Sequence, residues 1–98
     1  MKLKLAFHPA VRPEVREAYR WYERQRAGLG AEFIAAIERV YDRIRKTPKL
    51  HAIVCDDIRR ALPRKFPYGV YYRLHEDHIE ILAVHHSSRD PAGWKSRM

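Results

Sequence analysis

Two amphipathic segments joined by a short, glycine-containing linker constrain the fold of this chain more than any other sequence feature. At about 100° per residue, each segment gathers its apolar side chains into one stripe, as expected for a helix that buries a single face. The first stripe consists of Val11, Val15, Ala18, Tyr19 and Tyr22, with Arg26 falling within the same stripe, and the second of Phe33, Ile34, Ile37, Val40, Tyr41 and Ile44. Gly28 and Gly30 lie between them, and glycine readily adopts the backbone angles of a helix end. So short a linker predicts an antiparallel helical hairpin.

Segments with strand character lie on both sides of this hairpin. A polar and apolar alternation runs from Lys2 to His8 and is followed by prolines, which end a strand. After the hairpin come three runs rich in β-branched and aromatic residues, Ile58 to Leu62, Phe66 to Leu74 and Ile79 to His85. We interpret Lys49 to Asp57 as a loop and Arg89 to Met98 as a polar tail.

The last strand carries apolar residues at both odd and even positions, as a strand in the middle of a sheet does. The sequence therefore predicts one domain over residues 1–98 with an α+β fold and the element order β-α-α-β-β-β. In this fold the helical hairpin packs on one face of a mainly antiparallel, four-stranded sheet, because that arrangement buries both helical stripes.

The net charge of the chain limits the classes of partner that it favours. Twenty Lys and Arg residues against twelve Asp and Glu give a formal net charge of +8, which favours nucleic acid, an anionic membrane or an acidic protein. The N-terminus lacks the apolar run of a signal peptide, so we expect neither export nor a membrane partner. Cys55 is the only cysteine, which excludes an internal disulfide, and a cytoplasmic protein is predicted.

Two sequence runs resemble the RelE/ParE superfamily of type II toxins. The first extends from Arg59 to Arg73 and includes Leu62-Pro63-Arg64 and Tyr68-Gly69-Val70-Tyr71-Tyr72. The second, from Ile79 to Pro91, is similar to the closing strand of the family, which ends in one or two histidines and an Arg-Asp pair. The resemblance implies a growth-inhibiting toxin that is neutralised by a cognate antitoxin protein.

The same resemblance implies one of two activities, cleavage of messenger RNA on the ribosome or poisoning of DNA gyrase. The RNA-cleaving branch carries an arginine directly after the tyrosine of the middle meander strand and a tyrosine near the C-terminus. Gly69 stands at the first position, and Trp94 or Lys95 falls near the second, while Arg89 keeps the late arginine. These departures favour the ParE-like branch, which does not look like a nuclease.

The candidate residues for binding a target or an antitoxin are mostly cations and tryptophans. They are Arg59, Arg60, Arg64, Lys65, Arg73, His86, Arg89, Trp94 and Trp21. The first five lie among aromatic residues with no acid between Ile58 and Leu74, which is typical of a surface for an anionic ligand and also of a solvated strand edge. Trp21 falls at the flank of the first helical stripe, so it marks either an interface or the rim of the hairpin turn.

If the chain is a ribonuclease, Arg89 and His86 are its candidate catalytic residues, since cleavage needs a cation and an acid–base group beside the phosphate. His85 and His86 are adjacent in a strand, so at most one of them points into such a site. His75 and His78 bracket two acids in a predicted turn, without the ligand spacing of a metal site. No metal and no cofactor are expected.

The leading hypothesis is therefore a ParE-like toxin that binds DNA gyrase and is held inactive by its antitoxin. The first alternative is a ribosome-dependent endoribonuclease that cuts messenger RNA. The second alternative is a basic nucleic-acid-binding module, although no recognition-helix or base-stacking signature stands in the sequence.

Overall fold

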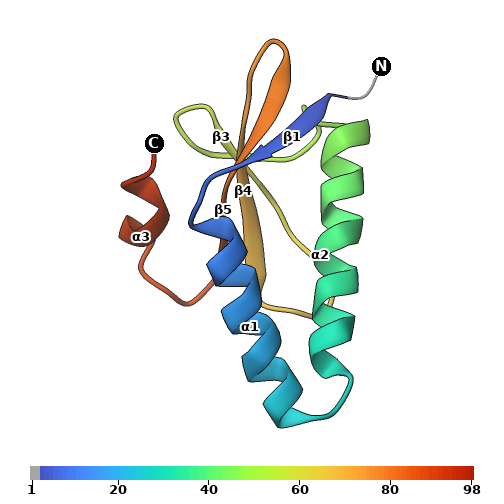
Figure 1. The fold of residues 1–98 in the computed structure, drawn as a ribbon. Coiled ribbons are helices and arrows are strands. Elements are labelled where there is room, and N and C mark those ends of the chain that lie inside the picture. Colours follow the sequence, from blue (N-terminus) through green and yellow to red (C-terminus); the bar gives the residue numbers. More distant parts are fainter. Residues whose placement is uncertain (1–2) are drawn as a thin grey trace.

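A computed structural model describes residues 3–98 and contains two layers, in which a helical hairpin covers one face of a sheet (Figure 1). The hairpin consists of α1 and α2, which lie side by side and antiparallel. The elements are β1 (Lys4–Phe7), α1 (Val11–Gln25), α2 (Leu29–Lys46), β2 (Ile53–Cys55), β3 (Ile58–Ala61), β4 (Tyr68–Leu74), β5 (His78–His86) and α3 (Ala92–Lys95). The α+β fold and the helical hairpin are confirmed. The predicted start of the first strand at Lys2 lies outside the described residues.

The sheet has five strands in the order β1-β5-β4-β3-β2 rather than the predicted four. The extra strand is β2, which lies in the segment that we interpreted as a loop and pairs with β3 through Ile53 opposite Arg59 and Cys55 opposite Ile58. Three residues are too few to show an alternating pattern, which is why the sequence did not reveal this strand. β1 pairs with β5 in parallel and the other pairs are antiparallel.

β5 occupies an interior position between β1 and β4, as its apolar residues on both faces predicted. A register shift opposite Tyr71 and Tyr72 interrupts its pairing with β4. As a result Leu82 and Ala83 are both packed with Tyr71, whereas Ile81 belongs to the core under the helices. This bulge therefore decides which residues at the end of β5 face the helical hairpin.

The main core lies between the hairpin and the sheet. Phe33, Val40 and Ile44 of α2 are completely buried, and they pack with Tyr72 and Ile79 of the central strands. Their spacing along α2 is that of one helical face, so the predicted stripe is the buried surface. Among residues 3–98, no helix has the length and apolar character needed to cross a membrane.

The hairpin turn depends on its two glycines. Gly28 has a φ of +91°, a left-handed backbone conformation that residues with a side chain rarely adopt. Gly30 is buried against α1, where a Cβ would lie 2.7 Å from the carbonyl oxygen of Tyr19. The carboxylate of Glu23 accepts hydrogen bonds from both glycine amides, at 3.0 and 2.9 Å, and so fixes the turn.

The C-terminal segment is not the polar tail that the sequence suggested. It forms α3, and Trp94 is only 4% exposed because its ring stacks on Tyr71 with centroids 4.4 Å apart. Together with Ile58, Leu82 and Ala83 these two rings form a second, smaller cluster. Figure 1 shows α3 on the side of the sheet away from α2. Trp94 anchors α3 to the sheet, and a count of polar residues does not reveal such a contact.

Candidate partner-binding site

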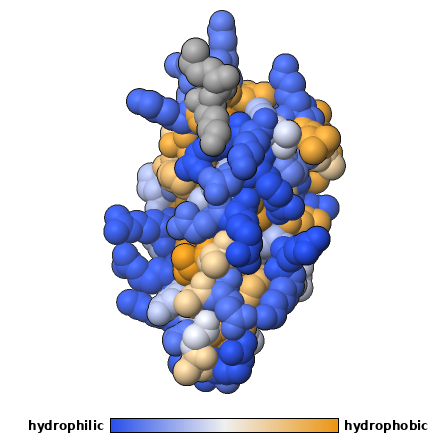
Figure 2. All heavy atoms as spheres, turned by 90° about the vertical axis from the view of Figure 1, so that its right-hand side faces the viewer, coloured by the Kyte–Doolittle hydropathy of each residue, from blue (hydrophilic) through white to orange (hydrophobic). Residues whose placement is uncertain are grey.

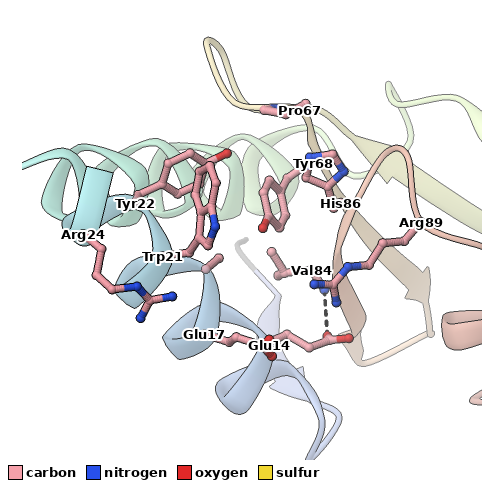
Figure 3. Close-up of a pocket in the computed structure, with 11 residues that line it drawn as sticks. Glu14, Glu17, Trp21, Tyr22, Arg24, Pro67, Tyr68, Val84, His86 and Arg89 are labelled. Carbon is pink, nitrogen blue, oxygen red and sulfur yellow. Dashed lines mark hydrogen bonds between the residues drawn. The ribbon is translucent and has the colours of Figure 1, made fainter. Parts of the chain in front are cut away.

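A groove of about 470 Å³ opens between α1 and the neighbouring ends of β4 and β5 (Figure 3). The helix supplies one wall and the strands, with the loop that follows β5, supply the other. The lining residues are Glu14, Glu17, Ala18, Trp21, Tyr22, Arg24, Pro67, Tyr68, Val84, His86 and Arg89. The lining thus combines aromatic rings with charged groups of both signs.

Trp21 is the largest exposed group of the helical wall. It lies at the flank of the α1 stripe, and its side chain is 51% exposed while its ring makes an edge contact with Tyr22 at 5.1 Å. Figure 3 shows the indole between Arg24 and Tyr68. A tryptophan held at one edge and open on the other is well suited to contact a partner, since such residues dominate many interfaces.

Tyr68 and His86 form the opposite wall because they are directly paired across β4 and β5. Their rings meet edge to face, with centroids 5.1 Å apart, and Tyr68 also packs against Phe33 of the core at 5.0 Å. Burial raises the pKa of Tyr68 above its usual range, with Tyr22 adding to the effect, while the Arg89 guanidinium acts in the opposite direction. Burial also raises the pKa of Tyr22. Both hydroxyls are therefore neutral at physiological pH and remain hydrogen-bond donors.

The loop after β5 is ordered around His86. The imidazole Nδ1 accepts a hydrogen bond from the Ser88 amide at 3.1 Å and lies 2.8 Å from the Ser88 hydroxyl. The amide of Arg89 donates to the carbonyl oxygen of His86 at 3.1 Å, which brings the exposed Arg89 to the rim of the groove. The loop thus presents one imidazole and one guanidinium to the same space.

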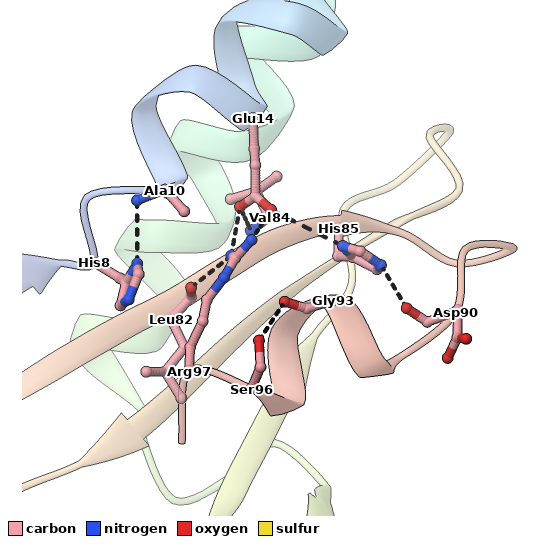
Figure 4. A network of polar contacts seen from close by, with 10 residues as sticks. All are labelled: His8, Ala10, Glu14, Leu82, Val84, His85, Asp90, Gly93, Ser96 and Arg97. Carbon is pink, nitrogen blue, oxygen red and sulfur yellow. Dashed lines mark hydrogen bonds and ion pairs between the residues drawn. The ribbon is translucent and has the colours of Figure 1, made fainter.

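Glu14, at the inner end of the groove, has a structural role (Figure 4). Its carboxylate accepts hydrogen bonds from both terminal nitrogens of Arg97, at 3.0 and 2.7 Å, and from the Val84 amide at 3.2 Å. Arg97 also donates to the carbonyl oxygen of Leu82 at 3.0 Å. The pairing of β1 with β5 ends at Phe7 and Ile81. Beyond that point the side chains of Glu14 and Arg97 satisfy backbone groups on the edge of β5 that faces away from β4.

The structure thus brings three predicted site residues, Trp21, His86 and Arg89, into one groove. His85 points away from them and packs against Gly93, whose Cβ would lie 3.1 Å from the imidazole. The opposite orientation of the two histidines is the predicted one. Trp94 is not at the surface, because its ring is buried between α3, to which it belongs, and the sheet.

The other predicted cations are dispersed. Arg59 donates to the carbonyl oxygens of Lys49 and His51, Arg73 pairs with Asp57 at 3.1 Å, and Lys65 pairs with Glu32 at 2.6 Å. Arg60 and Arg64 are exposed. Arg59 is paired with Tyr72 and Arg60 with Tyr71, so the two arginines lie on opposite faces of the sheet.

Gly69 shows how the chain departs from the nuclease pattern. It is buried in β4, and a side chain at this position would place its Cβ 3.0 Å from both Arg60 Cδ and Tyr71 Cε1. An arginine here would have to displace the Arg60 side chain. Gly69, at the first of these departures, and Trp94, one of the two residues near the second, both lie close to Tyr71 on the face covered by α3.

Two comparisons with known proteins agree with this architecture. The fold is similar to a solved structure described as a chromosomal ParDE toxin–antitoxin system from P. aeruginosa, with a TM-score of 0.65 and 11% identity over 87% of this chain and 96% of that chain. At that identity the likeness concerns the fold. No curated protein sequence matches the chain. The family model for the ParE toxin of the type II toxin–antitoxin system parDE matches residues 5–91, and the chain therefore belongs to the ParE toxin family.

Proposed function

We propose that this type II toxin inhibits growth by binding DNA gyrase, in the cytoplasm, through the groove between α1 and the ends of β4 and β5. The observation that carries the proposal is the half-exposed Trp21, which faces Tyr68 and His86 across a preformed groove. The groove offers rings with neutral hydroxyls and, at its rim, Arg24 and Arg89. Such a combination suits a protein surface better than a reaction centre.

The antitoxin is the second partner. A chain with a net charge of +8 attracts an acidic or amphipathic segment, which can fold on binding and cover an extended surface. We expect it to cover the helical hairpin or the basic strands. Co-expression with the adjacent open reading frame should restore growth and yield a stable complex. If co-expression neither restored growth nor yielded a complex, this support for a toxin–antitoxin pair would be lost.

The alternative function is RNA cleavage, which one observation favours: His86 and Arg89 line the same groove. Against it, His86 Nδ1 is engaged with Ser88, and Gly69 stands where the resemblance places the arginine of the nuclease branch. A cation without an evident acid–base partner stabilises charge but does not move protons.

One experiment separates the two functions. Expression of the wild type and of Arg89→Ala should be induced in parallel cultures, with gyrase-dependent DNA breaks and messenger RNA cleavage measured in each. We expect DNA breaks with the wild type, fewer with Arg89→Ala, and RNA cleavage at background in both. Codon-positioned RNA cleavage that disappears in Arg89→Ala would identify a ribonuclease instead.

A further inference from the structure

A second groove, of about 490 Å³, lies beside α2 on a different part of the molecule. It runs between α2 and the segment that joins β3 to β4, and its lining is dominated by Arg39, Arg43, Lys46 and Arg64. Figure 2 views the protein from the side on which Figure 1 draws α2 and shows hydrophilic side chains projecting over much of this face. None of the residues that line the first groove takes part in it.

The helix and the joining segment hold these cations together. Arg39, Arg43 and Lys46 follow one another at intervals of four and three residues, so they share one face of α2. The Arg43 guanidinium donates to the carbonyl oxygen of Leu62 at 2.7 Å and ties the joining segment to the helix, which brings Arg64 to the facing wall. The two walls of the groove are therefore held together by the hydrogen bond from the Arg43 side chain to the Leu62 backbone.

The charge of this groove is almost uncompensated. Asp42 is its one carboxylate, and Asp42 accepts from Arg45 at 2.7 Å. Within residues 3–98, the side chains of Arg39, Lys46 and Arg64 make no ion pair and no hydrogen bond. Like charges held at one place repel each other, and a groove concentrates their field, so the site favours an anion.

The side chains present favour phosphate over a protein ligand. Apart from Ala36 the lining holds no apolar residue and no ring, so it offers no pocket for the apolar anchors that protein partners insert. Guanidinium groups bind phosphate oxygens in a two-pronged geometry, and a row of cations along one helix face follows a chain of phosphates. We propose that this groove binds the phosphate backbone of nucleic acid, independently of the target contacted by the first groove.

The proposal is tested by titrating the purified full-length chain into a fluorescent DNA duplex and, separately, into a single-stranded RNA at several salt concentrations. Arg39, Lys46 and Arg64 are replaced by alanine together, while Arg43 is kept because it holds the joining segment. We expect the triple variant to bind about ten-fold or more weakly, with the slope of log affinity against log salt reduced by about three. The two nucleic acids show which source of phosphate is preferred.

A control variant with the same change in net charge decides whether the groove itself matters. Lys4, Arg16 and Lys95 are exposed, lie on three different elements, β1, α1 and α3, and form no ion pair within the described part of the chain. Their joint replacement by alanine should weaken binding by no more than about three-fold. If both triple variants lost the same affinity for nucleic acid, net charge alone would explain the binding and the proposal would be overturned.

Two further outcomes bear on the ligand. A polyglutamate peptide that displaces DNA at equal charge concentration would overturn the proposal in favour of an acidic protein segment. If the triple variant has a lower melting temperature than the wild type, Arg39→Gln and Arg64→Gln are measured singly. Each should lower the slope of log affinity against log salt by about one. An unchanged slope in both would also reject a phosphate site at this place.

Discussion

The two faces of the sheet are covered in very different ways. On one face α1 and α2 bury a continuous core that includes Phe33, Tyr72 and Ile79. On the other, the short α3 covers a small cluster around Tyr71 by means of Trp94. Tyr71 and Tyr72 are neighbours in β4 and contribute to opposite faces. The comparison indicates that the first face determines whether the chain folds and the second whether its C-terminus stays attached.

The largest effect is expected on the helical face. Phe33→Ala should lower the free energy of unfolding by about 3 to 5 kcal/mol, because it leaves a cavity at the centre of a cluster of aromatic rings. Phe33 is fully buried, and its ring lies 5.3 Å from both Tyr22 and Phe66. Chemical denaturation measures the change, with Leu50→Ala, at a position 77% exposed, as the control. A loss below about 1 kcal/mol would show that this core is not the main source of stability.

On the opposite face, Trp94→Ala should lower the free energy of unfolding by less, about 1.5 to 3 kcal/mol, which is the contribution of burying one large side chain. The reason is that α3 can detach and be solvated, whereas α2 cannot leave its core without unfolding the chain. Hydrogen exchange at residues 92–98 should accelerate in the variant while exchange in α2 stays slow. Acceleration in both helices to the same degree would mean that the two faces form one cooperative unit.

The link between the faces is the pair of Glu14 and Arg97, which joins α1 to the C-terminal segment at 2.7 Å. Arg97→Ala should cost about 1 to 2 kcal/mol, since both side chains are mostly buried and Glu14 would lose its charged partner. A double-mutant cycle with Glu14→Gln isolates the coupling between them. Additive losses would show that each residue acts only through its own bond to the β5 backbone.

A smaller effect, which depends on pH, is expected from Tyr72 on the helical face. Its hydroxyl donates to the carbonyl oxygen of Pro48 at 2.6 Å, and burial raises its pKa to about 12, against the opposing influence of Arg59. The fold therefore favours the neutral phenol, so this contribution is complete below pH 10.0 and is lost as the pH rises toward 12. Tyr72→Phe should cost about 1 kcal/mol at neutral pH and should flatten the alkaline decline. Urea titrations across that range measure both, and an equally steep decline in the variant would assign it to other groups, such as Tyr41.

The contrast between the faces also separates what the sequence could predict from what it could not. The stripes of α1 and α2 repeat over four or more turns, and a long periodic signal predicted the hairpin and its core correctly. β2 and α3 are too short for periodicity, and each exists because of a distant partner, β3 in one case and Tyr71 in the other. Local sequence does not contain those contacts.

The sites follow the same rule. Trp21, His86 and Arg89 were recognisable as residue types, but only the fold brings α1 beside the end of β5. Arg97 gave no signal, because its role is to satisfy strand edge groups left open where β1 ends. The cations of α2 share one helix face by their spacing alone, but Arg64 joins them only through the contact of Arg43 with Leu62.

Replacement of Trp21 should have the smallest effect on stability and the largest effect on toxicity. Trp21→Ala removes a ring that is already half exposed, so the free energy of unfolding should change by no more than about 1 kcal/mol, less than for Trp94→Ala. Toxicity should nevertheless fall strongly, because the groove would lose its largest apolar contact surface. Trp21→Phe should restore part of it by keeping a ring beside Tyr22. Growth curves after induction, read beside thermal melts, compare the three proteins, and full toxicity in a stably folded Trp21→Ala would move the target-binding site away from this groove.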